Sequence, residues 1–436
     1  MILQALNEYY NRKQASPDPK DRLPAFGLEE KEIPFIIELN TQGELINISD
    51  TRTFEGKKPV PQRFLVPKGV KKTSGVSANL LWDTAEYVLG VDTKGKPERV
   101  AEQKAEFRKR IAELPEHHQQ DESVKAVLAF LDHIDLNALE TQACWETIKT
   151  ENPLLSFRLQ GDVQLVSQRL GLTAAEEDDN DAGSARMCLV TGDEVPTERL
   201  HPSIKGVWGA QTSGANIVSF NADAFRSYNK EQGDNAAVGK PAAFAYTTAL
   251  NHLLAKGSRQ RVQVGDASTV FWAAQPHDLE TLVPDLFGEA PKDDPSRGTE
   301  ALKALYRSAE SGNFSVGDEA TRFHVLGLAP NAARISIRFW ETQPALELAK
   351  RLRQHFDDLA IARAPHDPEH LSLFRILTSI AVLNKADNIP PNLGGDIIRS
   401  IVEGLPYPAT LLNQAVQRCR AEQNVTYARA AAIKAC

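Results

Sequence analysis

The sequence has little of several features that define a secreted, metal-binding or membrane protein. It contains four cysteines among 436 residues, and no two of them form a C-x-x-C pair. Scattered cysteines disfavour a disulfide scaffold or a zinc site and are typical of a reducing cytoplasm. No apolar run approaches the roughly 18 residues that cross a membrane. The N-terminus also lacks the basic region and cleavage site of a secretory signal. We therefore expect a cytoplasmic protein without membrane spans.

The composition is otherwise that of an ordinary globular protein, but the charge is unevenly distributed. Hydrophobic residues make up 42% and charged residues 25% of the chain, and the formal net charge is −8. This acidity argues against a protein that binds nucleic acid non-specifically through an overall positive charge, although a net charge can hide local basic patches. Residues 51–75 hold seven Lys or Arg against one acid. Residues 174–185 hold five acids and no base, which is typical of a solvated linker.

The length and the hydrophobic patterns predict a mixed α+β protein with two or three domains. A chain of 436 residues is too long for a single core. We expect an N-terminal α+β domain with a basic loop over 1–172, an acidic linker over 173–186, a turn-rich α+β domain over 187–343 and a helical segment over 344–436.

Local signals place individual strands and helices along the chain. In the N-terminal part they predict a hairpin over 33–49, a strand over 63–67 and a helix from about Ser77 to Gly90. Further on they predict a helix from Pro241 to Gly257 and a hairpin that turns at Gly265-Asp266. An alternating strand should place Ile335, Ile337 and Phe339 on one face. After residue 344, apolar stripes such as the one from Leu373 to Leu383 predict helices.

Motifs for bond chemistry are incomplete. The segment GVDTKGKP at residues 90–97 is close to a phosphate-binding loop, but Pro97 replaces the hydroxyl that holds Mg²⁺. Cys188 and His201 lack an activating context, so we expect a buried thiol at Cys188. Two His-Asp pairs in Pro-flanked turns leave a metal-dependent nuclease as the alternative function; they are His277-Asp278 and His366-Asp367. We expect no catalytic residue, no metal and no cofactor.

Long, idiosyncratic segments spread over nearly the whole chain carry a resemblance to a known family. Together the segments resemble the large subunit of the type I-C CRISPR Cascade surveillance complex. They read MILQALNEYY, PVPQRFLVPKGVKKTSGVSANLLWDTAEYVLG, CLVTGDEVPTERLHPSIKGVWGAQTSGANIVSFNADAFRSYNKEQGDNAAVG, AFAYTTALNHLL and FHVLGLAPNAARISIRFW. The family continues into a C-terminal helical region that resembles the Cascade small subunit. Since this chain ends at Cys436, we expect it to lack that region and its role in holding the displaced strand.

The resemblance implies a non-catalytic role in RNA-guided DNA recognition. Cascade large subunits sit beside the 5′ end of the CRISPR RNA, recognise the protospacer-adjacent motif (PAM) in duplex DNA and assist duplex opening. They present the displaced strand to a recruited helicase–nuclease and do not cut. The implied partners are the CRISPR RNA, target double-stranded DNA, the helicase–nuclease and the other Cascade subunits, which are the backbone, the 5′-end guide-binding and the small subunits.

Two segments supply candidate nucleic-acid contacts. In the basic loop, phosphates are expected at Arg63, Lys68, Lys71 and Lys72, and phosphates or groove edges at Thr73, Ser74 and Asn79. In a glycine-rich block, the candidate readers of base edges are Lys205, Gln211, Thr212, Ser213 and Asn216. Weaker phosphate candidates are Arg259, Arg261, Arg334 and Arg338. Two other interpretations stay open, namely that these are solvated structural loops, and that the protein is a scaffold contacting only protein and guide RNA.

Overall fold

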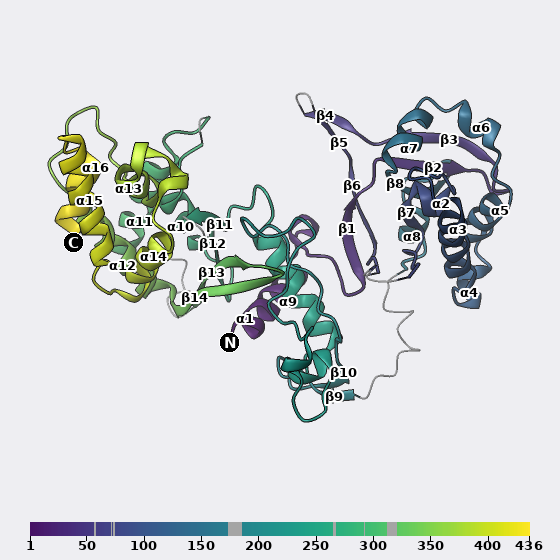
Figure 1. Ribbon diagram of the computed structural model, residues 1–436, viewed down its shortest axis with the longest axis horizontal. Coiled ribbons are helices and arrows are strands. Elements are labelled where there is room, and N and C mark those ends of the chain that lie inside the picture. The colour runs from purple at the N-terminus through teal and green to yellow at the C-terminus, as the bar shows by residue number, and fades with distance from the viewer. Residues whose placement is uncertain are drawn as a thin grey trace. The chain divides into compact units, whose positions relative to one another are not determined.

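The protein folds into two compact units that are not continuous in sequence. The computed structural model describes residues 1–55, 58–70, 72, 75–172, 185–264, 267–291, 293–311 and 321–436 (Figure 1). Pro24–Ala182 form one unit, called here the inserted unit. Met1–Leu23 and Gly183–Cys436 form the other, called the main unit. The expected α+β class is confirmed. The three-part domain division stays a prediction, and most of the predicted acidic linker lies outside the described residues.

The inserted unit is built on a four-stranded sheet with the order β3-β2-β8-β7. Its strands are β2 (Phe35–Leu39), β3 (Leu45–Asp50), β7 (Trp82–Thr84) and β8 (Leu154–Leu159). β2 and β3 form the predicted antiparallel hairpin. The Asn40 side chain closes its turn by accepting hydrogen bonds from the backbone N–H groups of Gln42 and Glu44. β8 lies parallel to β2 and antiparallel to β7.

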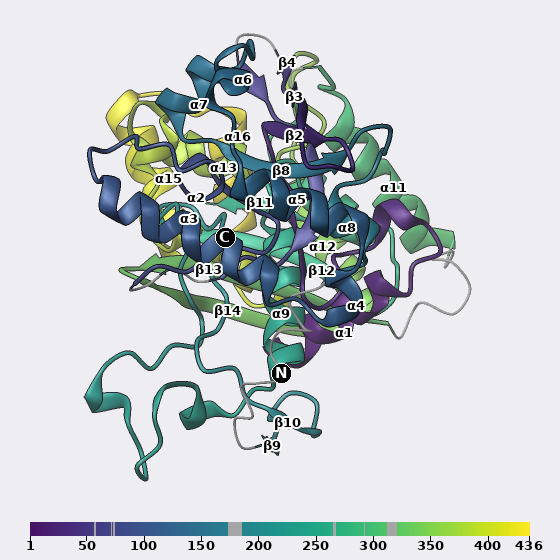
Figure 2. The same ribbon diagram turned by 90° about the vertical axis from the view of Figure 1, so that its right-hand side faces the viewer.

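Helices cover this sheet, and two short strand pairs extend the unit. The helices are α2 (Ala85–Val88), α3 (Pro97–Ala112), α4 (Glu116–Gln119), α5 (Glu122–Asp132), α6 (Leu136–Glu140), α7 (Trp145–Glu151) and α8 (Val166–Arg169). The pairs are β1 (Leu28–Glu32) with β6 (Arg63–Pro67), and β4 (Thr53–Glu55) with β5 (Lys58–Val60). α5 packs on β2 and β8 (Figure 2). Phe107 of α3, Phe130 of α5 and Phe157 of β8 meet in the core there.

The predicted helix from Ser77 to Gly90 is wrong over most of its length. Residues 82–84 form β7, and only Ala85–Val88 are helical. The buried Asp83 carboxylate accepts hydrogen bonds from the backbone N–H groups of Asn79 and Thr84, and Leu81 has a φ of 59°. These features hold the segment in a non-helical conformation. Its apolar residues are buried whether or not they share a helical face, so their spacing was misleading.

The main unit contains a four-stranded antiparallel sheet that is buried on both faces. Its strands are β11 (Arg261–Val264), β12 (Ala267–Ala273), β13 (Arg322–Asn331) and β14 (Arg334–Pro344), in that order. α1 (Ile2–Gln14) and α9 (Lys240–Leu253), which lie side by side, share one core with the sheet (Figure 1). The second core contains α10 (Leu279–Phe287), α11 (Arg297–Ser311), α12 (Ala345–Leu359), α13 (Leu373–Ile380), α14 (Leu393–Glu403), α15 (Ala409–Glu422) and α16 (Tyr427–Ala435).

The remaining elements of the main unit are short. They are β9 (Ala185–Met187) with β10 (Glu194–Pro196), and the 3₁₀ helices η1 (Pro19–Asp21), η3 (Asp223–Phe225), η4 (Gln232–Ala236), η5 (Val382–Asn384) and η6 (Ala386–Asn388). The predicted helix after Pro241 and the predicted helices after residue 344 are confirmed. The predicted hairpin is confirmed as the β11–β12 pair, while its turn at Gly265-Asp266 lies outside the described residues. None of the helices in the described ranges has the length and apolar composition of a membrane span.

A bulge in β14 overturns the prediction that its three apolar residues share one face. Gly327 pairs with Phe339 but Leu328 pairs with Ile337, so the alternation shifts by one residue between them. Ile335 therefore lies in the core with α9, whereas Phe339 lies in the core with α12. Ile337 is 41% exposed.

Candidate nucleic-acid interface

The start of the basic loop is exposed but firmly anchored to β1. Arg63 pairs with Glu32 at 3.1 Å, and 66% of its side chain stays exposed. The backbone N–H of Lys68 donates to the carbonyl of Gly27, and that of Gly69 donates to Glu29 Oε1 at 2.7 Å. Lys71, Thr73 and Ser74 lie outside the described residues. The described cations of this loop are therefore held on a fixed backbone.

Two of the predicted contact residues hold the loop in place. Lys72 Nζ lies 2.8 Å from both carboxylate oxygens of Asp83, whose side chain is 1% exposed. The same ammonium lies 3.6 Å from the centroid of the Tyr87 ring. Asn79 is buried, and its Oδ1 accepts a hydrogen bond from the Val70 N–H at 3.0 Å. A direct contact of either residue with DNA stays a prediction, since both already have partners within the protein.

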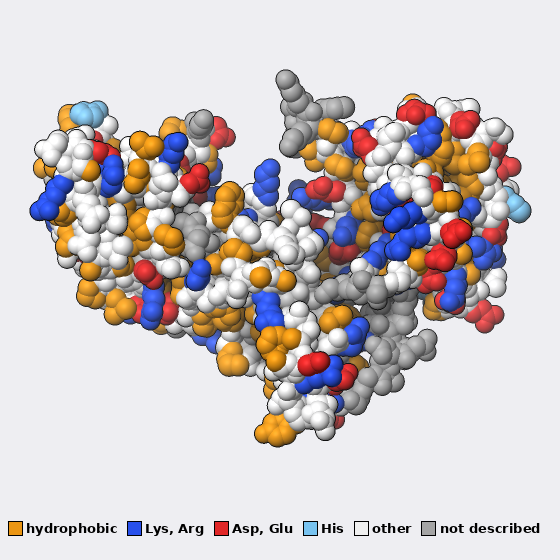
Figure 3. Space-filling model, in the orientation of Figure 1, with side chains coloured by type: hydrophobic (Ala, Val, Ile, Leu, Met, Phe, Trp, Pro, Cys, Tyr) orange, Lys and Arg blue, Asp and Glu red, His pale blue; other side chains and the backbone are white. Residues whose placement is uncertain are grey.

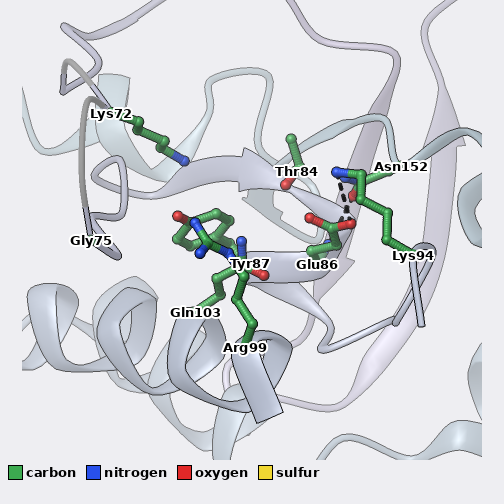
Figure 4. A pocket seen from close by; sticks show the side chains of 9 residues that line it. All are labelled: Lys72, Gly75, Thr84, Glu86, Tyr87, Lys94, Arg99, Gln103 and Asn152. Atoms are coloured by element: carbon green, nitrogen blue, oxygen red, sulfur yellow. Dashed lines mark hydrogen bonds and ion pairs between the residues drawn. The ribbon is translucent and has the colours of Figure 1, made fainter. Parts of the chain in front are cut away.

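A polar cavity of about 450 Å³ lies beside Lys72 (Figure 4). It is lined by Lys72, Gly75, Thr84, Glu86, Tyr87, Lys94, Arg99, Gln103 and Asn152. Arg99 and Gln103 reach it from the first turns of α3, and Lys94 reaches it from the preceding loop (Figure 4). Sequence reasoning missed these three residues. The sequence did contain one indication of the cavity: Gln103 is a polar residue at a core position of α3, between Val100 and Phe107.

One wall of the cavity is a buried carboxylate with several partners. Glu86 Oε1 accepts a hydrogen bond from the Thr93 hydroxyl at 2.6 Å and lies 3.2 Å from Lys94 Nζ. The Glu86 N–H donates to Asn152 Oδ1 at 2.9 Å. Burial acts to raise the pKa of Glu86, but the hydrogen bonds from Thr93 and Lys94 outweigh burial and lower it. Glu86 is therefore an ionised acceptor at neutral pH.

The segment over 90–97 is not a phosphate loop in its geometry. Asp92 Oδ1 accepts hydrogen bonds from the backbone N–H groups of Lys94 and Lys96. These bonds lower the pKa of Asp92 and use donors that a phosphate loop would turn toward its ligand. The backbone N–H groups of Lys94 and Lys96 are therefore not free to meet an anion.

The glycine-rich block in the main unit exposes part of the predicted set. Lys205, Gln211, Thr212 and Ser213 are exposed. Asn216 instead anchors the block, because its Nδ2 donates to the carbonyls of His201 and Pro202 and its carbonyl accepts from the Ile335 N–H. Sequence reasoning missed Trp208, whose side chain is 62% exposed although its N–H is held by Ser268 Oγ.

The arginines proposed as weaker contacts have partners of their own. Arg259 pairs with Asp285 at 3.1 Å, and Arg261 Nη1 donates to the Leu254 carbonyl at 2.7 Å. Burial lowers the pKa of Arg261. Arg334 donates to Asn221 and stacks on the Phe225 ring at 4.4 Å. Arg338 is exposed beside the bulge in β14.

The residues considered for bond chemistry serve local structure. His277 Nδ1 accepts a hydrogen bond from the Leu279 N–H, and Asp367 accepts one from the Ala364 N–H. Within the described ranges, no group of three His, Cys, Asp or Glu is arranged to hold a metal ion. Cys188 is the expected buried thiol, at 1% exposure.

The backbone of the glycine-rich block depends on Gly206, which yields a first prediction. Gly206 has a φ of +84°, and a Cβ there would lie 2.6 Å from the Leu254 carbonyl oxygen. Gly209 has a similar φ of +73°, but its Cβ would meet only Pro330 Cγ, at 3.4 Å. Gly209→Ala should cost about 1–2 kcal/mol of unfolding free energy from left-handed strain alone. Gly206→Ala should cost roughly 2 kcal/mol more, because backbone must also move.

Urea denaturation of the two variants checks this difference. Both substitutions add one methyl group to the same loop at a positive φ, so Gly209→Ala is the matched control. Equal losses of stability in the two variants would show that the contact between Gly206 and Leu254 does not constrain the block.

A family model for CRISPR-associated proteins matches residues 6–436, nearly the whole chain. The protein is therefore a CRISPR-associated protein. It belongs to the family described as CRISPR-associated protein (Cas_Csd1), the family of the type I-C Cascade large subunit, which confirms the resemblance seen in the sequence. No curated protein gives a significant match.

Proposed function

We propose that this protein is the non-catalytic large subunit of a type I-C surveillance complex that recognises the PAM in duplex DNA. In this role it assists duplex opening and helps to recruit a helicase–nuclease. Its partners are the CRISPR RNA, the target duplex and the other Cascade subunits, in the cytoplasm. The observation that carries the proposal is the family match over residues 6–436.

Physical chemistry explains how an acidic protein can serve this purpose. The guide RNA reads most of the target by base pairing, so the protein need only grip duplex backbone and read a short motif. A few exposed cations suffice for the grip, because each neutralised phosphate releases counterions. Arg63 and Lys205 are exposed cations in the inserted and the main unit. Lys and Arg side chains also gather on the face of the inserted unit that carries β7 and α2 (Figure 3).

The metal-dependent nuclease is not proposed. His277-Asp278 and His366-Asp367 have no third ligand placed with them among the described residues. The local hydrogen bonds of His277 and Asp367 are those of turn residues.

Removing charge from the basic loop tests the proposal. In the assembled complex, Lys68→Ala with Lys71→Ala should weaken duplex binding and reduce the slope of log affinity against log salt by roughly one to two. Lys72 is kept, because its ion pair with Asp83 belongs to the fold. Filter binding over a salt series measures both quantities.

The control is Lys125→Ala, which removes an exposed cation of the same unit on α5. It should leave affinity and slope unchanged. An unchanged slope in the double variant would remove the basic loop from the interface and would favour the scaffold interpretation.

A further inference from the structure

Trp208 exposes its indole from a loop whose backbone is held at several points. The side chain is 62% exposed, although the preceding Val207 lies in the core. The Ala210 N–H closes a turn on the Val207 carbonyl. The Trp208 N–H donates to Ser268 Oγ at 2.9 Å, and two backbone hydrogen bonds join the ends of the loop over residues 204–215. Because the backbone is already ordered, the indole offers a large binding surface at a low cost in conformational entropy.

The tip of the β13–β14 hairpin adds a flat cation beside this loop. A Cβ on Gly209, the residue after the tryptophan, would lie 3.4 Å from Pro330 Cγ, so the loop touches the hairpin. Arg334 Cζ lies 4.4 Å from the centroid of the Phe225 ring, and Arg334 Nη2 donates to Asn221 Oδ1. The Nε and Nη1 of this guanidinium have no hydrogen-bond partner among the described residues. Arg334 also lines a hollow of about 250 Å³, so part of its side chain is open to a ligand.

The polar side chains near the indole are not used by the fold. Gln211, Thr212 and Ser213 are exposed, and their side chains make no hydrogen bond with a described residue. Lys205 is exposed as well. Residues 199–222 contain two Lys or Arg and no Asp or Glu, in a chain whose formal net charge is −8. The loop therefore presents an aromatic face, available hydrogen-bonding groups and positive charge together.

We propose that this surface binds an unpaired strand of nucleic acid, with a base stacked on Trp208 and phosphates at Lys205 and Arg334. Proteins that hold single strands combine cations along the backbone with aromatic side chains on which bases stack. Amide and hydroxyl side chains, such as those of Gln211 and Thr212, can add contacts to phosphates and sugars. The site goes beyond the proposed function, because it needs neither a duplex nor the assembled complex.

The combination of groups decides between ligand classes. A duplex keeps its bases stacked on one another, so it would meet the cations and leave the indole without a partner. An apolar protein surface would cover the indole and leave the cations without acceptors. An unpaired strand offers flat base faces and phosphates together, so it matches the whole surface.

Fluorescence anisotropy of labelled probes mixed with the full chain tests this site. The main probe is a deoxythymidine strand of about 12 nucleotides, which is within the size of known single-strand sites. The others are its abasic counterpart, a uridine strand and a duplex, all of the same length. The wild-type chain should bind the thymidine strand more tightly than the abasic strand. Comparison of the thymidine and uridine strands identifies DNA or RNA as the source of the unpaired strand.

Trp208→Ala should weaken binding of the thymidine strand about tenfold and leave binding of the abasic strand and of the duplex unchanged. Trp208→Phe keeps an aromatic face and should restore most of the affinity, a rescue that a disrupted loop would not show. Arg334→Gln removes one phosphate contact, so the slope of log affinity against log salt should fall by about 0.7 for both deoxy strands. The melting temperature of Trp208→Ala should stay near the wild-type value, because most of the indole is exposed.

Tyr228→Ala is the matched control for an exposed ring. The Tyr228 side chain is 94% exposed in the same unit, but the loop around it is acidic, since Arg226 is paired with both Asp223 and Glu231. A polyanion should avoid this loop, so the variant should bind every probe as the wild type does.

Three results would overturn the site. These are no binding of either base-containing single strand by the wild-type chain, an unchanged affinity for the thymidine strand or an equal loss for the abasic strand in Trp208→Ala, and an equal loss in Tyr228→Ala. The first would leave Trp208 as a contact for a partner protein. None of them bears on the salt slope of duplex binding by the assembled complex with Lys68 and Lys71 replaced, so the failure of this site and the failure of the proposed function are distinguishable.

Discussion

Lowering the pH from 6.5 to 5 should remove about 3 kcal/mol from the stability of the main unit while the inserted unit keeps its stability. The cause is a set of three histidines buried in the main unit. Burial lowers the pKa of His324 and of His370 to about 4, and that of His355 to about 3. In the unfolded chain each histidine titrates near its ordinary value of about 6.5.

The sign follows from which state binds more protons. Between pH 6.5 and 4 the unfolded chain protonates these three histidines and the folded unit does not, so stability falls as pH falls. Glu341 acts in the opposite direction, because burial and the neighbouring Glu403 carboxylate raise its pKa to about 7. The folded unit therefore binds one extra proton on Glu341 in this window. Well below pH 6.5 the net difference approaches two protons, which corresponds to about 2.7 kcal/mol per pH unit.

The carboxyl groups of the inserted unit whose pKa is shifted do not make its stability depend on pH between 6.5 and 5. Hydrogen bonds from Arg52 lower the pKa of Asp50, and those from Arg108 lower the pKa of Asp132. The stability from these groups is present above their unfolded pKa and is lost only as pH falls below it. Pulse proteolysis in urea at pH 7.0, 6.0 and 5.0, with peptides assigned to each unit by mass spectrometry, compares the two units directly.

The control for the acid effect is His324→Phe. The imidazole stacks on Trp340 at a centroid distance of 5.2 Å and lies 5.2 Å from Trp272, so a phenyl ring keeps the aromatic stack. The variant loses the hydrogen bond to Thr342 at every pH. The fall in its stability per pH unit should be smaller than that of the wild type by about 1.4 kcal/mol, because one titrating histidine is removed. A wild-type slope in this variant would show that His324 does not take part.

The sequence predicted best where one physical rule decides the structure. Asn40 in a polar turn between two apolar runs predicted the β2–β3 hairpin, and the stripe Leu348, Leu352 and Phe356 predicted α12. The stripe from Leu373 failed at Leu383, which is 70% exposed, because the helix ends at Ile380. Apolar spacing shows where a helix can continue but not where tertiary contacts end it.

The candidate site was predictable only in outline. The cluster of lysines marks the basic loop, but nothing in the sequence shows that Lys72 meets a buried carboxylate eleven residues further on. The cavity likewise needs residues from β7, α2, α3 and the C-terminal end of α7 that are close only in the folded unit. Gln103 on the core stripe of α3 was a visible anomaly, although its unpaired oxygen is a property of the structure alone.

Asp83→Ala should destabilise the inserted unit by about 3 kcal/mol. The substitution removes the acceptor of three hydrogen-bond donors, which are Lys72 Nζ and the backbone N–H groups of Asn79 and Thr84. Breaking a buried ion pair from one side costs about 3–5 kcal/mol. The lower end applies because a third of the Lys72 side chain is exposed.

A double-mutant cycle with Lys72→Ala isolates the ion pair from the backbone contacts. The coupling between Lys72 and Asp83 should be about 1–2 kcal/mol in urea denaturation. The matched control is the cycle of Arg63→Ala with Glu32→Ala, because that exposed pair belongs to the same loop and should couple by less than about 0.5 kcal/mol. Equal coupling in the two cycles would mean that burial of Asp83 does not strengthen its pair.

The same variant connects the fold of the loop to the proposed grip on DNA. Asp83→Ala removes an acid, so by charge alone it should strengthen binding to a polyanion. If the loop must be held in place to contact the duplex, Asp83→Ala should instead weaken binding by the assembled complex, at a temperature where the inserted unit is still folded. Electrostatics and loop geometry therefore predict opposite changes in affinity. Tighter duplex binding by the variant would show that Lys72 acts better when released, and that the ion pair restrains the loop rather than preparing it.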